Sequence, residues 1–170
     1  MTTPQIDKYR RGWTSGLPET LCGFGSMIDQ TEIQREWILR MVGKYGIRTI
    51  HDIGAGDLNW IKVIKWPYPV KYRAFDLVPR RSDVRQFDLI HEKPQAVDLT
   101  MCLWVLNHMP EDHARVALDN LRASGSKYLM YTYWPSMADF LDLGAIESKI
   151  IRTRYMETGD IDFEIRLIRC

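Results

Sequence analysis

The first strong pattern is a run of apolar residues at helical spacing. It predicts a helix over roughly 31–45. Asp29 or Thr31 can cap the start of this helix, and Gly46 stands just past its end, where glycine is favoured. The apolar positions are Ile33, Trp37, Ile38, Met41 and Val42.

Further along the chain, short β-branched or aromatic runs alternate with helical ones. The expected strands cover 48–53, 72–76, 84–87, 96–105 and 128–133, and the expected helices cover 57–65 and 112–123. Such alternation favours an α/β fold with a mostly parallel sheet and right-handed crossovers. The segments 150–155 and 161–168 alternate around the turn 157–160, which predicts a hairpin that adds one antiparallel edge strand.

Length and composition fit a single globular domain. The chain has 170 residues and a formal net charge of +1, so bulk charge does not favour a nucleic-acid-binding role. Residues 1–27 are rich in turn formers and are expected to form an arm or lid before the domain 28–170. The chain has no signal-peptide pattern and no apolar run of membrane-spanning length.

The three cysteines, Cys22, Cys102 and Cys170, form no C-x-x-C pair and no even set. We therefore expect neither a disulfide framework nor a metal site. Reduced thiols fit a cytoplasmic protein.

The sequence Asp52-Ile53-Gly54-Ala55-Gly56-Asp57 follows the first expected strand. Two glycines in a tight strand-to-helix turn let the backbone approach a ligand closely. Asn59 occupies the place of the third glycine in a dinucleotide fingerprint, and the Asp57 carboxylate would repel a pyrophosphate. S-adenosylmethionine (SAM) is cationic, so the loop fits SAM better than NAD. A plain tight turn is the alternative.

Other residues at expected strand ends extend this hypothesis. Asp76 ends the second strand, about 20 residues downstream, where a carboxylate can accept both ribose hydroxyls. Asp88 is placed to meet an adenine amino group, although it can equally cap a turn. Trp104 and His108 follow the strand 96–105, at the edge where a parallel sheet binds ligands.

The runs HDIGAGDLNWI, YRAFDLVP and DLTMCLWVLNHMPED together resemble class I SAM-dependent methyltransferases. More narrowly, they are similar to a small Rossmann-like subgroup with D-x-x-C-G-D-x-N-W and C-R-D-V-L-x-H-L motifs. The N-terminal pattern Gly23-Phe24-Gly25-Ser26, with Thr31 and Arg35, also matches this subgroup, as does Ser126-Lys127-Tyr128-Leu129. The resemblance covers about residues 12–135.

The resemblance implies a Rossmann-like fold, SAM as cofactor and S-adenosylhomocysteine as product. By the same resemblance, the glycine loop would hold the methionine part of SAM. The residues near 76 and 88 would hold the ribose and the adenine, and the residues at the end of the strand 96–105 would line the sulfonium side. Trp60 is expected to pack beneath the loop. The implied cofactor-binding residues are Gly25, Ser26, Thr31, Asp52, Gly54, Gly56, Asp57, Asp76, Leu77, Asp88, Leu89, Leu103 and Trp104.

The chain also departs from the subgroup. Ala55 replaces the usual cysteine, and Leu103-Trp104 replaces an Arg-Asp pair. Only 137–145 separates the fifth strand from the hairpin, where relatives carry an insert that builds the acceptor site. The resemblance therefore defines the cofactor better than the acceptor.

Imidazole titrates near neutrality, so His108 is the candidate general base, with packing or helix capping as the alternative. His51 is expected to be structural. Tyr131, Tyr133 and Trp134 can form an aromatic acceptor wall or ordinary packing. The basic clusters can contact a phosphate-bearing acceptor or be solvated; they are Arg10-Arg11, Lys62 with Lys65, and Arg80-Arg81 with Arg85.

Four functions remain open at this stage. The first is a SAM-dependent methyltransferase acting on a small-molecule or sugar-like acceptor, as a monomer or homodimer without a membrane partner. The second is a methyltransferase for nucleic acid or protein. Neither an N-P-P-Y-like stretch nor a Pro-Cys nucleophile follows the fourth strand, which disfavours two kinds of DNA chemistry. The third binds or cleaves SAM without methyl transfer, and the fourth, an NAD oxidoreductase, is disfavoured.

Overall fold

The computed structural model describes residues 18–134, 141–155 and 159–170. These residues form one seven-stranded sheet in the order β3-β2-β1-β4-β5-β7-β6. The strands are β1 (Thr49–Ile53), β2 (Lys71–Asp76), β3 (Val84–Gln86), β4 (Leu99–Cys102), β5 (Tyr128–Tyr133), β6 (Glu147–Tyr155) and β7 (Gly159–Arg169). The helices are α2 (Glu32–Tyr45) and α3 (Glu111–Arg122), with 3-10 turns η1 (Phe24–Ser26), η2 (Ile61–Val63) and η3 (Leu106–His108).

The first five strands pair in parallel, as expected. The C-terminal hairpin differs from the prediction in one respect. Its reversed strand, β7, is not at the edge but lies between β5 and β6, antiparallel to both. Strand β7 packs Phe163, Ile165 and Leu167 into the core under α2, whereas β6 forms the edge and leaves Ile150 66% exposed.

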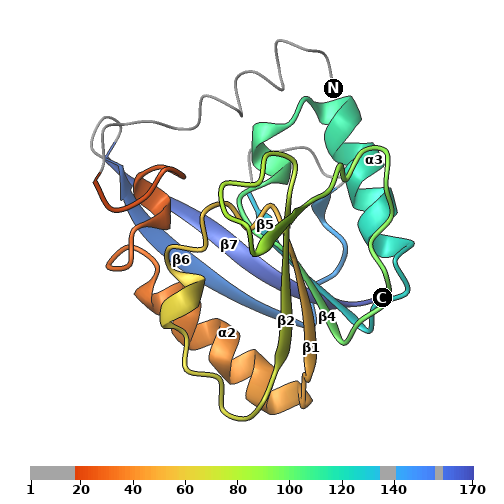
Figure 1. The fold of residues 1–170 in the computed structure, drawn as a ribbon, viewed down its shortest axis with the longest axis horizontal. Coiled ribbons are helices and arrows are strands. Elements are labelled where there is room, and N and C mark those ends of the chain that lie inside the picture. Colours follow the sequence, from red (N-terminus) through yellow and green to blue (C-terminus); the bar gives the residue numbers. More distant parts are fainter. Residues whose placement is uncertain (1–17, 135–140, 156–158) are drawn as a thin grey trace.

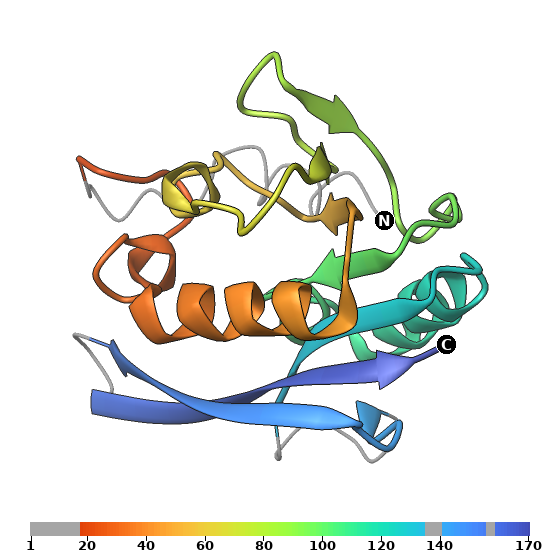
Figure 2. The same cartoon turned by 90° about the horizontal axis from the view of Figure 1, so that it is seen from below.

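The helices α2 and α3 lie on opposite sides of the sheet (Figure 1). Strand alternation sends Met101 and Met130 into the core under α2, and Cys102 and Leu129 into the core under α3. Figure 2 shows the long β6–β7 hairpin extending past α2. Each apolar face therefore packs against its own helix.

Helix α2 has nearly the predicted bounds, and Gly46 ends it in a left-handed conformation with φ of 63°. Its predicted cap is wrong in detail. The Thr31 hydroxyl accepts no helix N–H bond; it donates to the carbonyls of Met27 at 2.9 Å and Ile28 at 3.1 Å. Thr31 thus fastens the preceding turn to the helix.

The helix predicted over 57–65 is absent, and only the single turn η2 forms there. Leu58 has a left-handed φ of 61°, which a propagating right-handed helix does not accept. The strand predicted over 96–105 is likewise shorter, because Trp104 has a φ of 60° and turns the chain away after Cys102. Both deviations lie beside the glycine loop.

No helix in the described part of the chain is long and apolar enough to cross a bilayer. Within the same residues, no group of three His, Cys, Asp or Glu side chains is placed to hold a metal ion. The first 17 residues of the predicted arm lie outside the described residues.

Candidate functional site

An open cleft of about 1160 Å³ lies at the carboxyl ends of β1, β2 and β4, and we call it the strand-end cleft. This is the edge where parallel α/β sheets bind ligands. Most of the predicted site residues line it. They are Ser26, Asp52, Gly54, Gly56, Asp57, Asp76, Leu77, Asp88, Leu89, Leu103, Trp104 and His108.

The glycine loop forms the floor of the cleft. Gly54 has φ of 81°, and a Cβ atom there would lie 2.2 Å from Val105 Cγ2. Gly56 has φ of 63°, and its Cβ would lie 2.5 Å from Cys22 Sγ. Both positions therefore require glycine, for conformation and for space.

The end of β2 holds this loop in place through Asp76. Its Oδ2 accepts the Gly56 N–H at 2.8 Å, and its Oδ1 accepts the Val78 N–H at 2.9 Å. Burial raises the pKa of Asp76, although these hydrogen bonds oppose the shift. Each carboxylate oxygen can accept a further hydrogen bond, and Asp76 lines the cleft. The ribose role of Asp76 stays a prediction.

Asp52, at the centre of the sheet, is only 3% exposed. Its Oδ2 accepts a hydrogen bond of 2.6 Å from the Tyr72 hydroxyl. Burial raises the pKa of Asp52 to about 7, with Asp76 adding to the rise and Tyr72 opposing it. A cation in the cleft would stabilise the ionised carboxylate.

Asp57 joins the loop to the segment before η1. Its Oδ2 accepts hydrogen bonds from the Thr20 hydroxyl at 2.8 Å and the Leu21 N–H at 2.7 Å. Burial raises its pKa, but these bonds outweigh that and hold the pKa of Asp57 below its usual range. Asn59, which fills the third-glycine position, donates to Glu19 at 2.6 Å and to the Ser26 carbonyl at 3.0 Å. Asn59, the residue that departs from the dinucleotide fingerprint, thus holds the segment 19–26 against the glycine loop.

Gly25 and Thr31 are not among the residues that line the cleft. Thr31 is 1% exposed, and its hydroxyl faces the turn before α2. Ser26 alone of the three predicted closing residues lines the cleft.

Asp88 and Leu89 line another part of the cleft, where the sequence predicts an adenine. The Asp88 carboxylate accepts the Ile90 N–H at 3.0 Å and lies 2.9 Å from His91 Nδ1. Although burial raises it, these contacts hold the pKa of Asp88 below its usual range. The carboxylate therefore caps its own turn and also lines the cleft, while its adenine role stays a prediction.

Trp104, which follows β4, lines the cleft from that strand's end. Its backbone N–H donates to Thr132 Oγ1 at 3.0 Å, and its indole N–H donates to Gln34 Oε1 at 3.3 Å. Its ring centroid is 3.9 Å from that of Phe163 and 6.5 Å from that of Trp134. These contacts stabilise the left-handed backbone at Trp104.

The predicted aromatic wall is not assembled at the cleft. Tyr131 is fully buried in the core under α3 and donates to the Leu141 carbonyl at 2.7 Å. The Arg166 guanidinium lies 3.4 Å from the Tyr133 ring centroid. Neither tyrosine lines the cleft, and Trp134 reaches it only through its contact with Trp104.

His108 ends η3 and lines the cleft. Its Nε2 is 3.3 Å from Asn107 Nδ2. Its position at the end of β4 suits a base acting beside the bound ligand, a role that stays a prediction.

Sequence reasoning missed several lining residues. Trp60 lines the cleft as well as packing against the core. Burial, aided by Asp57, raises the pKa of the Cys22 thiol to about 12, so this cysteine is no thiolate nucleophile. The sequence offered one indication of Trp60 and Cys22, which is that both lie next to residues of the predicted motifs. The other missed residues are Ile53, Ala55, Val78, Arg80, Phe87, Val105 and Met109.

Solved methyltransferases share this fold. The N-methyltransferase NodS from Bradyrhizobium japonicum WM9, in complex with S-adenosyl-l-homocysteine, has a TM-score of 0.62 at 14% identity, covering 81% of this chain and 85% of that chain. The magnesium protoporphyrin IX methyltransferase ChlM from Synechocystis PCC 6803, with bound SAM, has a TM-score of 0.61 at 14% identity, covering 96% and 91%. The chain has the Rossmann-like methyltransferase fold.

The small RNA methyltransferase HEN1 is a further neighbour, with a TM-score of 0.52 at 14% identity over 82% of this chain and 25% of that chain. Identities this low show the shared fold and leave the substrate open. No protein-family model matches the sequence, and no curated protein sequence does.

The β1–β2–β3 part of the sheet carries fewer helices than is usual for the Rossmann-like methyltransferase fold. Helical crossovers normally cover both faces of such a sheet. Here the connections 54–70, 77–83 and 87–98, which all lie within the described residues, contain no α-helix. The β1–β2–β3 side of the sheet is consequently more open than the side under α3.

Proposed function

We propose that this protein is a SAM-dependent methyltransferase acting on a small-molecule acceptor. The observation that carries the proposal is the convergence of carboxylates on the strand-end cleft around a glycine loop. Asp52, Asp57 and Asp76 come from the ends of β1 and β2. NodS and ChlM, which share the fold, were solved with S-adenosylhomocysteine and SAM respectively.

The residues present fit this cofactor. Asp76 keeps acceptor capacity for two ribose hydroxyls. Asp52 and the ionised Asp57 supply negative charge near the loop, which favours a ligand with sulfonium and ammonium groups. Leu89 and Phe87 give the apolar surface that an adenine ring needs.

When bound, SAM supplies an electrophilic methyl group. Asp76 would hold its ribose, and the glycine loop would hold its methionine part. Leu103 and Trp104 would exclude water from the sulfonium side, and proximity would then provide much of the rate. His108 can take a proton from the acceptor at its imidazole nitrogen.

The acceptor is proposed to be small because the described walls enclose one cleft and because net charge is only +1. A nucleic-acid acceptor would call for a strongly basic surface.

Calorimetric titration with SAM, S-adenosylhomocysteine and NAD tests cofactor identity. We expect SAM and S-adenosylhomocysteine to bind and NAD not to. Asp76→Ala should weaken SAM binding at least tenfold, since it removes the ribose acceptor. Asp83→Ala is the matched control, because Asp83 pairs with Arg81 on the surface. No SAM binding at millimolar concentration, or an unchanged affinity in Asp76→Ala, contradicts the assignment.

Transfer itself needs a separate measurement. SAM carrying a labelled methyl group is incubated with the protein, with and without pools of small-molecule acceptors. Label appearing on an acceptor, with S-adenosylhomocysteine as co-product, supports transfer. Cleavage of SAM in the protein-only sample, or binding without turnover in every pool, favours the alternative of a protein that uses SAM without methyl transfer.

A further inference from the structure

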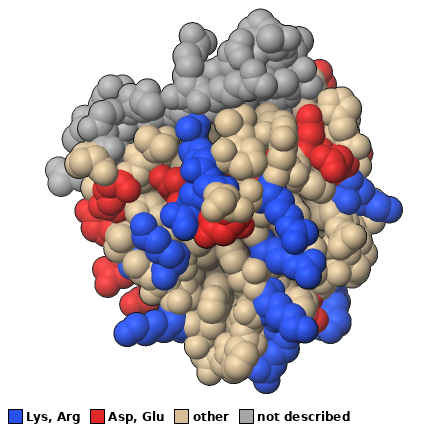
Figure 3. Space-filling view, in the orientation of Figure 1, with Lys and Arg blue, Asp and Glu red and all other residues tan. Residues whose placement is uncertain are grey.

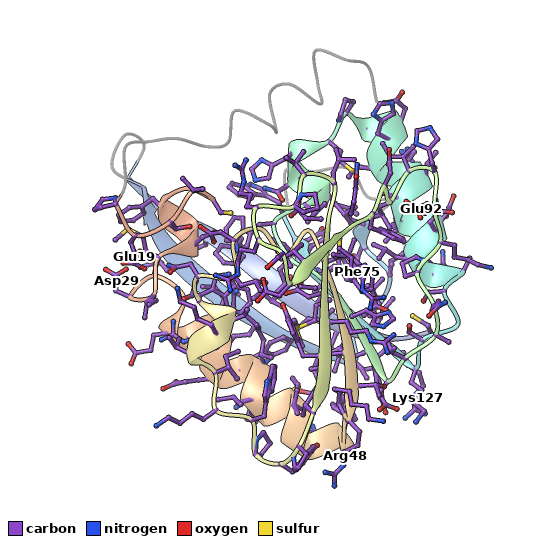
Figure 4. The ribbon with its side chains drawn as sticks, viewed as in Figure 1. Glu19, Asp29, Arg48, Phe75, Glu92 and Lys127 are labelled. Atoms are coloured by element: carbon purple, nitrogen blue, oxygen red, sulfur yellow. The ribbon has the colours of Figure 1, made fainter. Side chains whose placement is uncertain are left out.

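A second open cavity, of about 690 Å³, lies on the face of β1, β2 and β3 away from α2, and we call it the basic cavity. Phe75 and Phe87 form its upper wall, with ring centroids 5.6 Å apart, and Phe87 also lines the strand-end cleft. The segment 87–98, which carries no helix, forms its outer side. In Figure 4, Phe75 lies beside β2, and Glu92 lies on the loop beyond it.

Strand register brings the cations of this cavity together. His51 pairs with Arg73, and Phe75 pairs with Arg85. Since residues two apart on a strand share a face, Arg73 and Arg85 lie on the same side as His51. Lys93 joins them from the loop. Figure 3 shows Lys and Arg side chains gathered beside β2 on this side of the molecule.

The described residues leave the positive charge of the cavity without a paired carboxylate. Arg73, Arg85 and Lys93 are exposed, and among the described residues none of the three has a hydrogen-bonded or ion-paired carboxylate. The acidic group in the lining is Glu92, and its Oε1 accepts the Asp88 backbone N–H at 2.9 Å. The cavity therefore presents net positive charge.

His51 adds a buried polar group to the lining. It is 5% exposed, and its Nδ1 has no hydrogen-bond partner among the described residues. Burial, with the positive charges of Arg73 and Arg85, lowers the pKa of His51. A buried imidazole nitrogen without a partner is costly. An anion beside His51 would offset the charges of Arg73 and Arg85 and favour the protonated ring, whose Nδ1–H would then donate to the anion.

We propose that the basic cavity binds a phosphate group of a small molecule, held by Arg73, Arg85 and Lys93 with His51 at its inner end. Guanidinium groups bind phosphate oxygens in pairs, and a concave site favours one terminal phosphate over an extended strand. The net charge of +1 also disfavours a nucleic-acid backbone as the source. This site does not depend on the proposed methyltransferase activity.

The test is a titration followed by amide and imidazole NMR at constant ionic strength. The probes are inorganic phosphate, ribose 5-phosphate and a ten-nucleotide single-stranded RNA, with chloride as reference. We expect saturable binding of the two small phosphates, with the largest shifts at Arg73, Arg85 and the His51 ring. Non-saturable shifts, or tighter binding of the RNA than of ribose 5-phosphate, would overturn the proposal.

Variants locate the site. Arg73→Gln with Arg85→Gln should weaken phosphate binding at least tenfold, and both side chains are exposed enough that the fold should be kept. Lys62→Gln, an exposed cation on η2, is the matched control and should bind phosphate normally. Phosphate affinity equal in the double variant and the control contradicts the proposal. SAM affinity, measured on the same double variant, should be unchanged, which separates this site from the strand-end cleft.

Discussion

The two cavities beside the β1–β2 pair differ in charge although they share a wall. In the strand-end cleft, Asp52 and Asp76 face a ligand position. In the basic cavity, His51 and Arg73 come from neighbouring positions on the same two strands. Successive side chains on a strand point to opposite faces. A single step along β1 therefore separates a residue suited to a cation from a residue suited to an anion.

The two sites also differ in the contacts that form their walls. In the strand-end cleft, long-range contacts hold the glycine loop in place, with Thr20 and Leu21 donating hydrogen bonds to Asp57. The basic cavity is open because the connection 87–98 has no helix to cover it. One site is preorganised by hydrogen bonds between backbone and carboxylates, whereas the other is a set of exposed cations around one buried imidazole.

The largest effect should come from breaking the cleft at its glycine loop. Gly54→Ala combines a left-handed backbone with a Cβ that meets Val105, so we expect a loss of about 2–4 kcal/mol in the free energy of unfolding. SAM binding should be lost with it. Gly46→Ala is the control, since its φ is similar but nothing lies within 4 Å of the added Cβ. Chemical denaturation measures both, and equal losses would contradict the packing argument.

Asp98 is an acidic residue whose hydrogen bonds stabilise the sheet, and it lies outside both proposed ligand sites. Its Oδ2 accepts hydrogen bonds from the N–H groups of Arg48 and Thr49, and its Oδ1 accepts one from Lys127. Asp98→Ala should cost about 1–3 kcal/mol of stability, because those N–H groups lose their acceptor. SAM affinity of the folded variant should not change. A variant as stable as the parent would show that the bonds contribute nothing net.

The same residue gives a pH signature. Burial raises the pKa of Asp98, but its hydrogen bonds outweigh burial and lower it to about 2. Because the folded pKa is depressed, the stabilisation is present above the ordinary aspartate pKa of about 4 and is lost as pH falls toward 2. The stability gap between the parent and Asp98→Asn should therefore narrow over that window.

A smaller effect on SAM affinity should come from the charge of Asp52, and its pH dependence separates that charge from the shape of the cleft. Asp52 has a pKa raised to about 7, so at pH 6 most of it is protonated and must ionise when a cation binds. SAM affinity should rise about tenfold between pH 6 and pH 8, following the ionised fraction. Asp52→Asn should remove most of this dependence in calorimetric titrations. An equally steep profile in the variant would assign the proton to another group.

The smallest effect should be at the adenine side. Asp88→Ala removes one expected acceptor for the adenine amino group and should weaken SAM binding by about three- to tenfold, the value of a single hydrogen bond. His91→Ala, which removes the partner of Asp88, is the control and should change affinity less. Phosphate binding in the basic cavity should be the same in both variants.

Local chemistry was enough to predict the loop and the end of β2. Gly54 and Gly56 are needed where φ is positive, and Asp76 follows from its place at a strand end. The loss of the helix over 57–65 was not predictable, because the contacts of Asp57 and Asn59 with residues 19–26 fix the backbone around Leu58. The basic cavity depends on the register of β1, β2 and β3, which periodicity alone does not specify.

The most direct test is a crystal structure with S-adenosylhomocysteine bound. The account predicts that the ribose hydroxyls lie within hydrogen-bond distance of the Asp76 carboxylate, with the adenine against Phe87 and Leu89 and its amino group toward Asp88. It also predicts that the methionine part follows Gly54 and Gly56. A ligand bound outside the strand-end cleft, or a ribose turned away from Asp76, would contradict it.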